Sequence, residues 1–267
     1  MTADTQTLDD LRVEIDEIDD AIHERLMRRA GIVTRLKALK PARGAPGAMR
    51  PGREAEILAR RLARHHGPLP HAAIFGVWRE IVAASLALQG PFSIAVCAPR
   101  NTLALWDLAR VHFGSAAAMR LYRSPAAALT AVERERSVFA VLPMPTAGEA
   151  NPWWPRLADA AAEGPWIVAR LPQFEPLEAT DPGALLIANA DVGGEQNAVN
   201  LVAVRANTRE APARELGRHL DTVSRPSGYL HLVEVTGVPA GDSGGVATPL
   251  GGYAPPLRPS DLSERQR

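Results

Sequence analysis

The chain has 267 residues, enough for one large domain or two ordinary ones, and hydrophobic residues make up 46% of it, as in a globular protein with a core. Lysine plus arginine and aspartate plus glutamate number 30 each, and the single cysteine, Cys97, excludes both a disulfide framework and a metal site built from cysteines. The acidic N-terminus is not a signal peptide and no apolar run reaches membrane-spanning length, which predicts a cytoplasmic protein with no membrane partner.

Charge is unevenly distributed along the first 64 residues. Residues 1–24 hold nine acids and one base, Arg12, whereas residues 25–64 hold twelve lysines and arginines against two acids, Glu54 and Glu56. A basic segment beside an acidic one indicates an anionic ligand, a nucleic acid, or antiparallel pairing of the two segments. Nucleic acid is the weaker interpretation, because the basic segment has no aromatic residue for stacking and its cations are not confined to one helix face. We therefore expect no nucleic-acid partner.

The first 90 residues predict three helices. Residues 7–40 carry apolar side chains at spacings of three and four, which predicts a long amphipathic helix with a seam typical of coiled coils: Leu8, Leu11, Ile15, Ile18 and Ile22. Residues 41–49 are rich in Gly and Pro and predict a loop, a second helix runs over 51–66, and a third begins near residue 70 and stops at Gly90. One long helix and two shorter ones cannot close a core alone, so we expect a homodimer to complete it.

Beyond residue 91 strands and helices alternate. Strands are predicted at 92–98, 118–123 and 137–143 with helices at 102–114 and 124–135 between them, and further strands at 165–171, 184–189, 198–204 and 229–235. This order predicts an α/β domain with a mostly parallel sheet. Residues 238–267 are rich in Gly, Pro and Ser and are predicted to be disordered. The predicted organisation is a helical domain over 1–90, an α/β domain over 91–237, and a disordered tail over 238–267.

Polar residues interrupt the apolar stripes of two predicted helices. The seam of the first helix continues through Arg29 and Lys40, which lie eleven residues and about three turns apart, and so on one side. The third helix carries Ser85 and Gln89 on an apolar stripe in the same way. Snorkelling or bonding to the backbone is the plainer interpretation of any one of them. Together they indicate a small polar chamber in a helical bundle, because unpaired buried polar groups are costly.

These residues resemble a known family. The segments that carry the resemblance, in order and approximate spacing, are LDDLRVEIDEID, the Arg pair at 28–29, LKALK, RPGREAEIL and WREIVAASLALQ. They resemble the all-helical chorismate mutases, most of all the mutase domain that is fused to prephenate dehydratase, over residues 7–90. The resemblance implies an intertwined dimer of three-helix chains, and an isomerase that converts chorismate to prephenate without a cofactor or metal.

The resemblance also implies a role for each polar position. Two arginines and a serine would bind the substrate's carboxylates, two donors would bond the ether oxygen, and an acid with its arginine neighbour would meet the ring hydroxyl; in that order they are Arg12, Arg29 and Ser85, then Lys40 and Gln89, then Glu54 and Arg53. Arg53 would line the pocket or brace Glu54 by offsetting its charge. Arg50 stands where the family often has an acid. A Claisen rearrangement occurs within one molecule, so the protein needs only to hold the reactive conformer and stabilise charge on the ether oxygen.

The spacing of two arginines bears on the dimer. Arg12 and Arg29 are seventeen residues apart on one predicted helix, roughly 25 Å at ~1.5 Å per residue, which no small ligand spans. If both touch one chorismate, Arg12 must come from the partner subunit. An antiparallel partner would also set each acidic half against a basic segment.

Residues 92–237 resemble a degenerate prephenate dehydratase domain. FSIAVCAPRNT aligns with the family's opening strand and Gly-rich loop but has no glycine, and FAVLPMPTA has Pro145-Thr146-Ala147 where the family has Glu-Asn-Ser. Val199, Asn200 and Leu201 stand where the resemblance places the catalytic Thr-Arg-Phe. We therefore expect no dehydratase chemistry and a remnant domain kept for stability or partner contacts. Two alternatives stay open, a bifunctional mutase–dehydratase and a non-catalytic dimer whose α/β domain binds a small ligand.

Overall fold

The computed structural model describes residues 7–39, 49–98, 103–135, 138–160, 164–175, 183–189, 198–210, 217–237 and 247–258. By its internal contacts the chain divides into two compact units, residues 1–43 and residues 44–267. The predicted sequence of a helical region followed by an α/β domain is confirmed. The domain boundary predicted after residue 90 stays a prediction, since by contacts the second and third helices belong with the α/β region.

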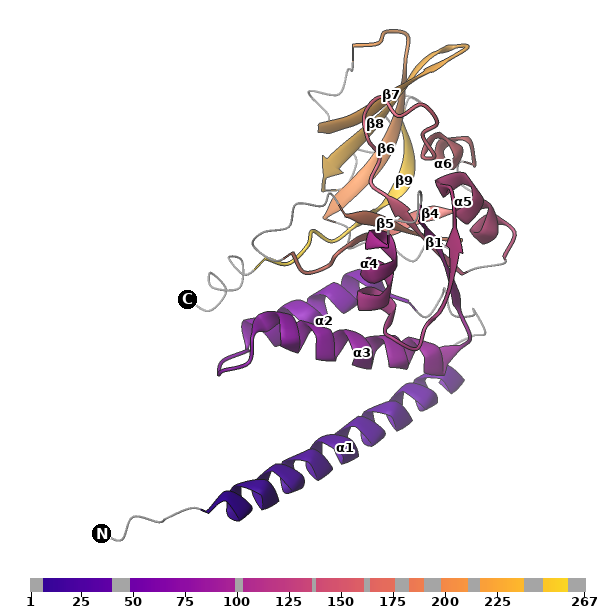
Figure 1. Ribbon diagram of the computed structural model, residues 1–267. Coiled ribbons are helices and arrows are strands. Elements are labelled where there is room, and N and C mark those ends of the chain that lie inside the picture. The colour runs from indigo at the N-terminus through magenta and orange to yellow at the C-terminus, as the bar shows by residue number, and fades with distance from the viewer. Residues whose placement is uncertain are drawn as a thin grey trace. The chain divides into compact units, whose positions relative to one another are not determined.

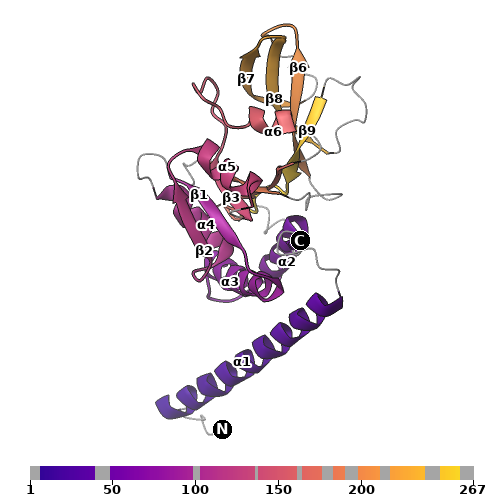
Figure 2. The same ribbon diagram turned by 90° about the vertical axis from the view of Figure 1, so that its right-hand side faces the viewer.

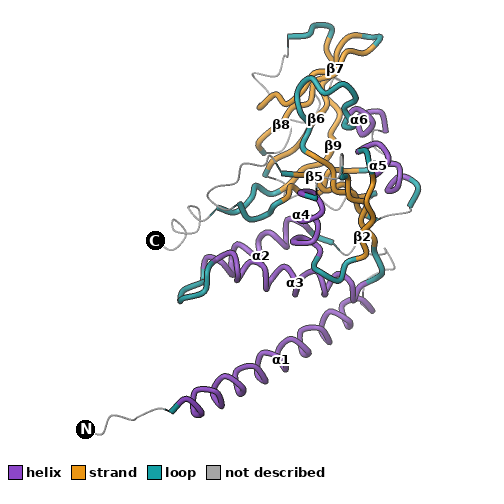
Figure 3. Tube along the Cα trace, in the orientation of Figure 1, coloured by secondary structure: helices purple, strands orange, loops and turns teal. Residues whose placement is uncertain are grey.

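The first unit is built on one uninterrupted helix, α1 (Leu8–Leu39), which is the long helix predicted from the sequence (Figures 1 and 3). Thr7 caps it: the Thr7 hydroxyl accepts from the Asp10 amide at 3.2 Å, and the Asp10 carboxylate accepts from the Thr7 amide at 2.9 Å. Val33 is the buried residue of α1. The apolar seam is otherwise exposed, with Leu8 at 73% and Ile15 at 57%. An amphipathic helix of this kind needs another surface to cover its apolar face.

The helices of the second unit are α2 (Pro51–Ala63), α3 (His71–Gln89), α4 (Ala104–Phe113), α5 (Pro125–Glu133) and α6 (Pro155–Ala160). The α2 and α3 helices lie side by side (Figures 1 and 2), and Leu58 and Leu62 of α2 pack with Phe75 of α3. Phe174, which follows the fourth strand, stacks on Phe75 with ring centroids 5.4 Å apart. The α2–α3 pair therefore shares a core with a segment of the α/β region.

By length and composition alone, α3 is the helix within the described residues that could cross a membrane. The sequence predicts no apolar run of that length, because Arg79 and Glu80 interrupt the run, whereas a mean over eighteen residues tolerates them. In the structure α3 packs on α2 and α4, and it buries Arg79 in hydrogen bonds to other elements of the unit. These contacts are those of a core helix.

The described strands form one nine-stranded sheet in the order β2-β1-β3-β5-β4-β9-β6-β8-β7. Their bounds are β1 (Ser93–Cys97), β2 (Ala118–Tyr122), β3 (Phe139–Pro143), β4 (Trp166–Leu171), β5 (Ala184–Ala188), β6 (Val199–Ala206), β7 (Arg218–Arg225), β8 (Gly228–Thr236) and β9 (Ala247–Tyr253). Parallel pairing joins β2, β1 and β3 and also β4 with β9, and the remaining pairs are antiparallel. The sheet is therefore mixed, with its parallel βαβ part at the start of the domain.

The main core lies around β1, β3, β4 and β5. These strands read as near-continuous apolar runs because both of their faces are covered, and every residue of β5 is buried. Helices α4 and α5 pack on β1 and β3, and α6 brings the buried indoles of Trp153 and Trp154 close by. In Figures 1 and 2, β6, β7 and β8 lie at the opposite end of this unit from α2 and α3.

The predicted disorder of residues 238–267 is wrong for part of that segment, because residues 247–253 form β9. This strand lies between β4 and β6 and joins the two halves of the sheet (Figure 1). Its sequence, ATPLGGY, has few β-favouring residues, and its strand geometry comes from its neighbours. Gly251 has φ +108°, and a Cβ there would lie 2.1 Å from the Ile167 carbonyl oxygen. The sequence also leaves β7 unpredicted, since Arg218–Arg225 carries polar side chains on an edge strand.

Gly251→Ala should destabilise the protein far more than Gly148→Ala. Both glycines have positive φ, but a Cβ at Gly148 meets nothing within 4 Å, so this control isolates the backbone strain, about 1 kcal/mol. At Gly251 the clash with backbone atoms of β4 adds to that strain, for a total of at least about 3 kcal/mol. The check is the shift in denaturation midpoint of each variant, and equal shifts would show that β9 does not approach β4 this closely.

Candidate active site

The predicted cations of the first unit lie along α1. Arg12 is exposed and pairs with Asp9 at 2.9 Å, and Arg29 is half-buried one residue from the start of the least exposed turn. Because α1 is one continuous helix, their separation of seventeen residues does amount to roughly 25 Å. Lys40 lies outside the described residues. The structure thus leaves the two described arginines too far apart on one chain to bind a single small molecule.

Ser85 and Gln89 lie one turn apart near the end of α3. The Ser85 hydroxyl donates to the Ile81 carbonyl at 2.6 Å, and the Gln89 amide donates to the Ser85 carbonyl at 3.2 Å. Ser85 is buried and Gln89 half-buried. Bonds of this kind to the preceding turn hold each polar group against the helix. They keep both side chains on the stripe where the sequence predicts a polar chamber.

The counter-charge of Glu54 is not the one predicted. The sequence places Arg53 beside Glu54 to offset its charge, but in the structure Arg53 is exposed and Glu54 pairs with Arg79 of α3 at 3.0 Å. Both partners of this pair are largely buried, with 12% of the Glu54 side chain and 3% of the Arg79 side chain exposed. Adjacent residues of a helix point about 100° apart, so Arg53 and Glu54 cannot both face α3.

Arg79 is the buried residue that sequence reasoning missed. Its guanidinium donates to four acceptors on separate elements: Glu54, the Gln173 side-chain oxygen at 3.2 Å, and twice to the His112 carbonyl, once through Nε at 3.0 Å. That carbonyl lies in the last turn of α4, where carbonyl groups have no partner within the helix. The signal that could have revealed Arg79 is an adjacent cation and anion in the middle of an otherwise apolar helix.

His112 is buried beside Arg79. Burial and, second, the nearby guanidinium hold the pKa of His112 well below its ordinary value of 6.5, so the ring is neutral. Its Nε2 atom has no hydrogen-bond partner among the described residues. The ring packs edge-on against Phe113 with centroids 4.7 Å apart. His112 therefore contributes a carbonyl acceptor and an apolar ring to this part of the unit.

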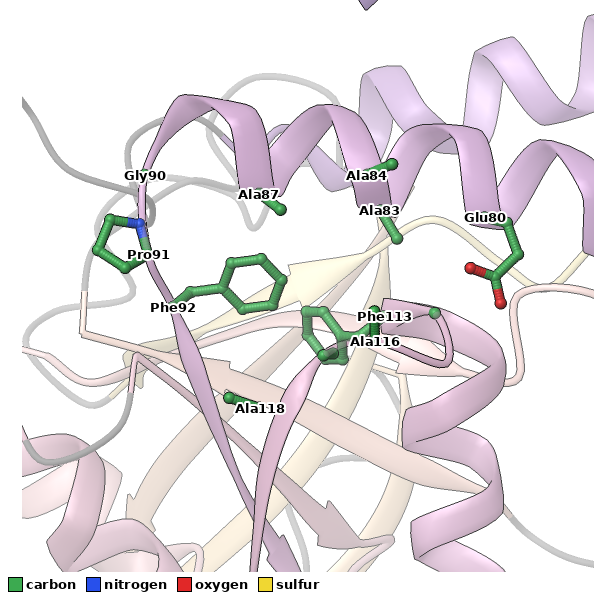
Figure 4. Close-up of a pocket in the computed structure, with 12 residues that line it drawn as sticks. Glu80, Ala83, Ala84, Ala87, Gly90, Pro91, Phe92, Phe113, Ala116 and Ala118 are labelled. Atoms are coloured by element: carbon green, nitrogen blue, oxygen red, sulfur yellow. The ribbon is translucent and has the colours of Figure 1, made fainter. Parts of the chain in front are cut away.

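A cavity of about 240 Å³ lies between α3, the end of α4 and the start of β2 (Figure 4). Alanine methyl groups of α3 and the rings of Phe92 and Phe113 line it, and the carboxylate of Glu80 lies at one side. Its lining contains no lysine or arginine. A dicarboxylate needs cations to replace its hydration, so this cavity does not suit a dianionic ligand.

The altered dehydratase-like positions are occupied by internal contacts. Val199, Asn200 and Leu201 begin β6, where Leu201 is fully buried and the Asn200 amide donates to the Gly237 carbonyl at 2.6 Å. Residues 99–102, in the predicted loop after β1, lie outside the described residues. Within the described part of the chain, no group of three or more His, Cys, Asp or Glu side chains is placed to hold a metal ion.

An all-helical region with this polar pattern, joined to an α/β domain, has counterparts among known proteins. Residues 11–90 match the family "Chorismate mutase type II". The bifunctional chorismate mutase/prephenate dehydratase of Pseudomonas aeruginosa is 34% identical over 143 residues, which is 52% of this chain and 38% of that protein. The enzyme of the same name from Neisseria gonorrhoeae is 35% identical over 117 residues, 42% of this chain and 31% of that protein. Residues 11–90 are a chorismate mutase type II domain.

The similarity does not end with the helices. A match over 52% of the chain is longer than its first 90 residues, so it continues into the α/β region. A solved structure, prephenate dehydratase from Streptococcus mutans, is 15% identical with a TM-score of 0.40 over 62% of this chain and 99% of that one. The matched part of this chain spans well under half the length of the curated relatives.

The lowered pKa of His112 makes a prediction about stability. The unfolded chain binds a proton at this imidazole near pH 6.5 and the folded chain does not, so stability falls as the pH is lowered through 6.5 toward the folded-state pKa. The contribution of His112 to the slope should reach roughly 1.4 kcal/mol per pH unit. Denaturation of wild type and His112→Leu between pH 7.5 and 5 measures it. Parallel stability curves for the two proteins would show that His112 is protonated in the fold.

Proposed function

We propose that this protein is a chorismate mutase, an isomerase of the cytoplasm that converts chorismate to prephenate in the biosynthesis of aromatic amino acids. The observation that carries the proposal is that the chorismate mutase match spans residues 11–90, which hold all seven polar positions of the predicted site. The proposed substrate-binding residues are Arg12, Arg29, Lys40, Arg53, Glu54, Ser85 and Gln89, of which Arg29, Lys40 and Gln89 act on the reacting atoms.

The proposed chemistry needs cations and donors and no cofactor. Guanidinium groups bind carboxylates in two-point geometry, so Arg12 and Arg29 would hold the dianion in its compact, reactive conformer. As the ether C–O bond stretches, negative charge grows on its oxygen, and donors from Lys40 and Gln89 would stabilise that charge mainly in the transition state. Glu54 would accept from the ring hydroxyl, which the rearrangement leaves unchanged.

A homodimer completes the proposed site. The length of α1 supports this, because it separates Arg12 from Arg29 by roughly 25 Å, and one substrate can touch both only if they come from different subunits. The exposed apolar seam of α1 supports it too, since a second copy of the helix would cover that seam. Antiparallel packing would bring the acidic first half of α1 against basic segments of the partner.

Prephenate is the proposed end product. Removing a ring hydroxyl together with a carboxylate needs a placed donor, and Val199 offers none while Asn200 is a short neutral amide already bonded to Gly237. The bifunctional names of the relatives favour the alternative that this chain also makes phenylpyruvate. The product that accumulates from chorismate distinguishes the two.

Arg29→Ala and Lys40→Ala should each lower kcat/KM for chorismate by at least about 100-fold, because each removes a charged contact made to the substrate in the transition state. Arg28→Ala is the matched control, since Arg28 is the exposed neighbour on the same helix. The assay follows loss of chorismate and appearance of prephenate and phenylpyruvate, with circular dichroism to confirm helical content. Wild-type protein without turnover would refute the proposal, and phenylpyruvate above background would favour the bifunctional alternative.

Mixing inactive Arg12→Ala and Arg29→Ala proteins should restore activity. In a two-fold dimer each mixed pair assembles one site with both arginines and one with neither, so random exchange recovers up to about a quarter of wild-type activity. Subunit exchange is verified by native mass spectrometry with one variant isotopically labelled. Complete exchange without recovery would place both arginines in a site of one chain, or Arg12 outside the site.

A further inference from the structure

We infer that Arg79 is a positioning residue for Glu54, and that through Arg79 the α/β region helps to form the mutase site. The inference rests on the proposed function, which gives Glu54 its contact with the substrate. Glu54 sits in the first turn of α2, next to residues 40–48 that lie outside the described part of the chain. The Arg79 contact is the ion pair that the structure records for Glu54, and it comes from a side chain that is itself buried.

Arg79 is held more firmly than it holds Glu54. Two of its hydrogen bonds go to the His112 carbonyl and one to Gln173, and all three acceptors belong to residues beyond position 90. Glu80, the next residue of α3, accepts from the Ser115 amide at 3.1 Å, so α3 is bonded to the end of α4 at two successive positions. A guanidinium with four hydrogen bonds has one orientation, and the carboxylate it binds takes its own orientation from it.

Gln173 is fixed as well. It lies between β4 and Phe174, which stacks on Phe75, and its backbone carbonyl accepts from the Leu257 amide at 2.8 Å. Its exposed fraction is 8%. The chain of contacts therefore runs from the segment after β4 through Gln173 and Arg79 to Glu54. An ionised carboxylate has acceptor sites on both oxygens, so Glu54 can bond Arg79 through Oε2 and accept a ligand hydroxyl through Oε1.

A positioning role has a kinetic signature that a purely structural role lacks. The ring hydroxyl does not change during the rearrangement, so its contact with Glu54 stabilises bound substrate and transition state alike, and losing that contact raises KM with little change in kcat. A variant that merely unfolds a fraction of the protein lowers kcat and leaves KM unchanged. The two roles can therefore be separated in the full-length protein.

The test is a double-mutant cycle in chorismate turnover with Arg79→Lys and Glu54→Gln. Lysine keeps the charge but cannot reach Glu54, Gln173 and the His112 carbonyl together, so Arg79→Lys should raise KM about tenfold with kcat within about twofold. In the Glu54→Gln background the same change should raise KM by no more than about twofold, because the contact it would misplace is already weakened. Equal factors in both backgrounds, or a loss in kcat alone, would overturn the inference.

Two further variants complete the design. Gln173→Met removes an acceptor of Arg79 at similar volume and should raise KM about threefold, again only when Glu54 is present; it also serves if Arg79→Lys does not fold. An unchanged KM in Gln173→Met would overturn the part played by the α/β region. Arg156→Lys is the control: Arg156 also bonds a glutamate, a backbone carbonyl and a neutral side chain, but between α6 and α5, and its KM and kcat should stay at wild-type values. Wild-type protein without turnover would instead refute the proposed function, and this inference with it.

Discussion

The guanidinium of Arg79 lies among apolar helices, where a cation is stable only if acceptors surround it. Its acceptors come from α2, from the last turn of α4 and from the segment after β4, which are far apart in sequence. Satisfying this one group requires α2 and α3 to sit against the α/β region in a single arrangement. Removing a partner from such a buried pair typically costs about 3–5 kcal/mol, so the arrangement resists slipping. The Phe75–Phe174 stack supplies the apolar half of the same contact.

The long helix α1 presents the opposite situation, because its apolar seam is exposed and its charges are segregated along its length. Isolated amphipathic helices owe most of their stability to what they pack against. Under the proposed function, that surface is a second copy of the chain, which would also bring Arg12 of one subunit toward Arg29 of the other. Dimer formation and assembly of the substrate site would then be a single event, and dilution would reduce both together.

The α/β region is stabilised by polar contacts made within it. Asp221, buried in β7, accepts from the Trp154 indole at 2.9 Å and from the Gly148 amide at 3.1 Å, and Tyr253 of β9 donates to Glu234 of β8 at 2.8 Å. Asn200 is likewise bonded within the sheet. Groups committed to hydrogen bonds of this kind hold a sheet together and are poorly placed to do chemistry. The described contacts fit a domain that supports the helical site, which is the role that Arg79 and Gln173 would give it.

Local periodicity in the sequence determined most of the elements. The three- and four-residue spacing of Leu8, Leu11 and Ile15 predicted α1 almost to its ends, and apolar runs predicted β1, β3 and β5, because those signals are carried by neighbouring residues. The polar positions on the helices were likewise visible as breaks in apolar stripes. Two features were decided only by tertiary structure. The strand β9 has no local signal, and it exists because β4 and β6 supply its hydrogen-bond partners. The partner of Glu54 proved to be Arg79 and not the adjacent Arg53, because neighbouring residues of a helix face different directions, and which of them meets another helix depends on how the helices pack.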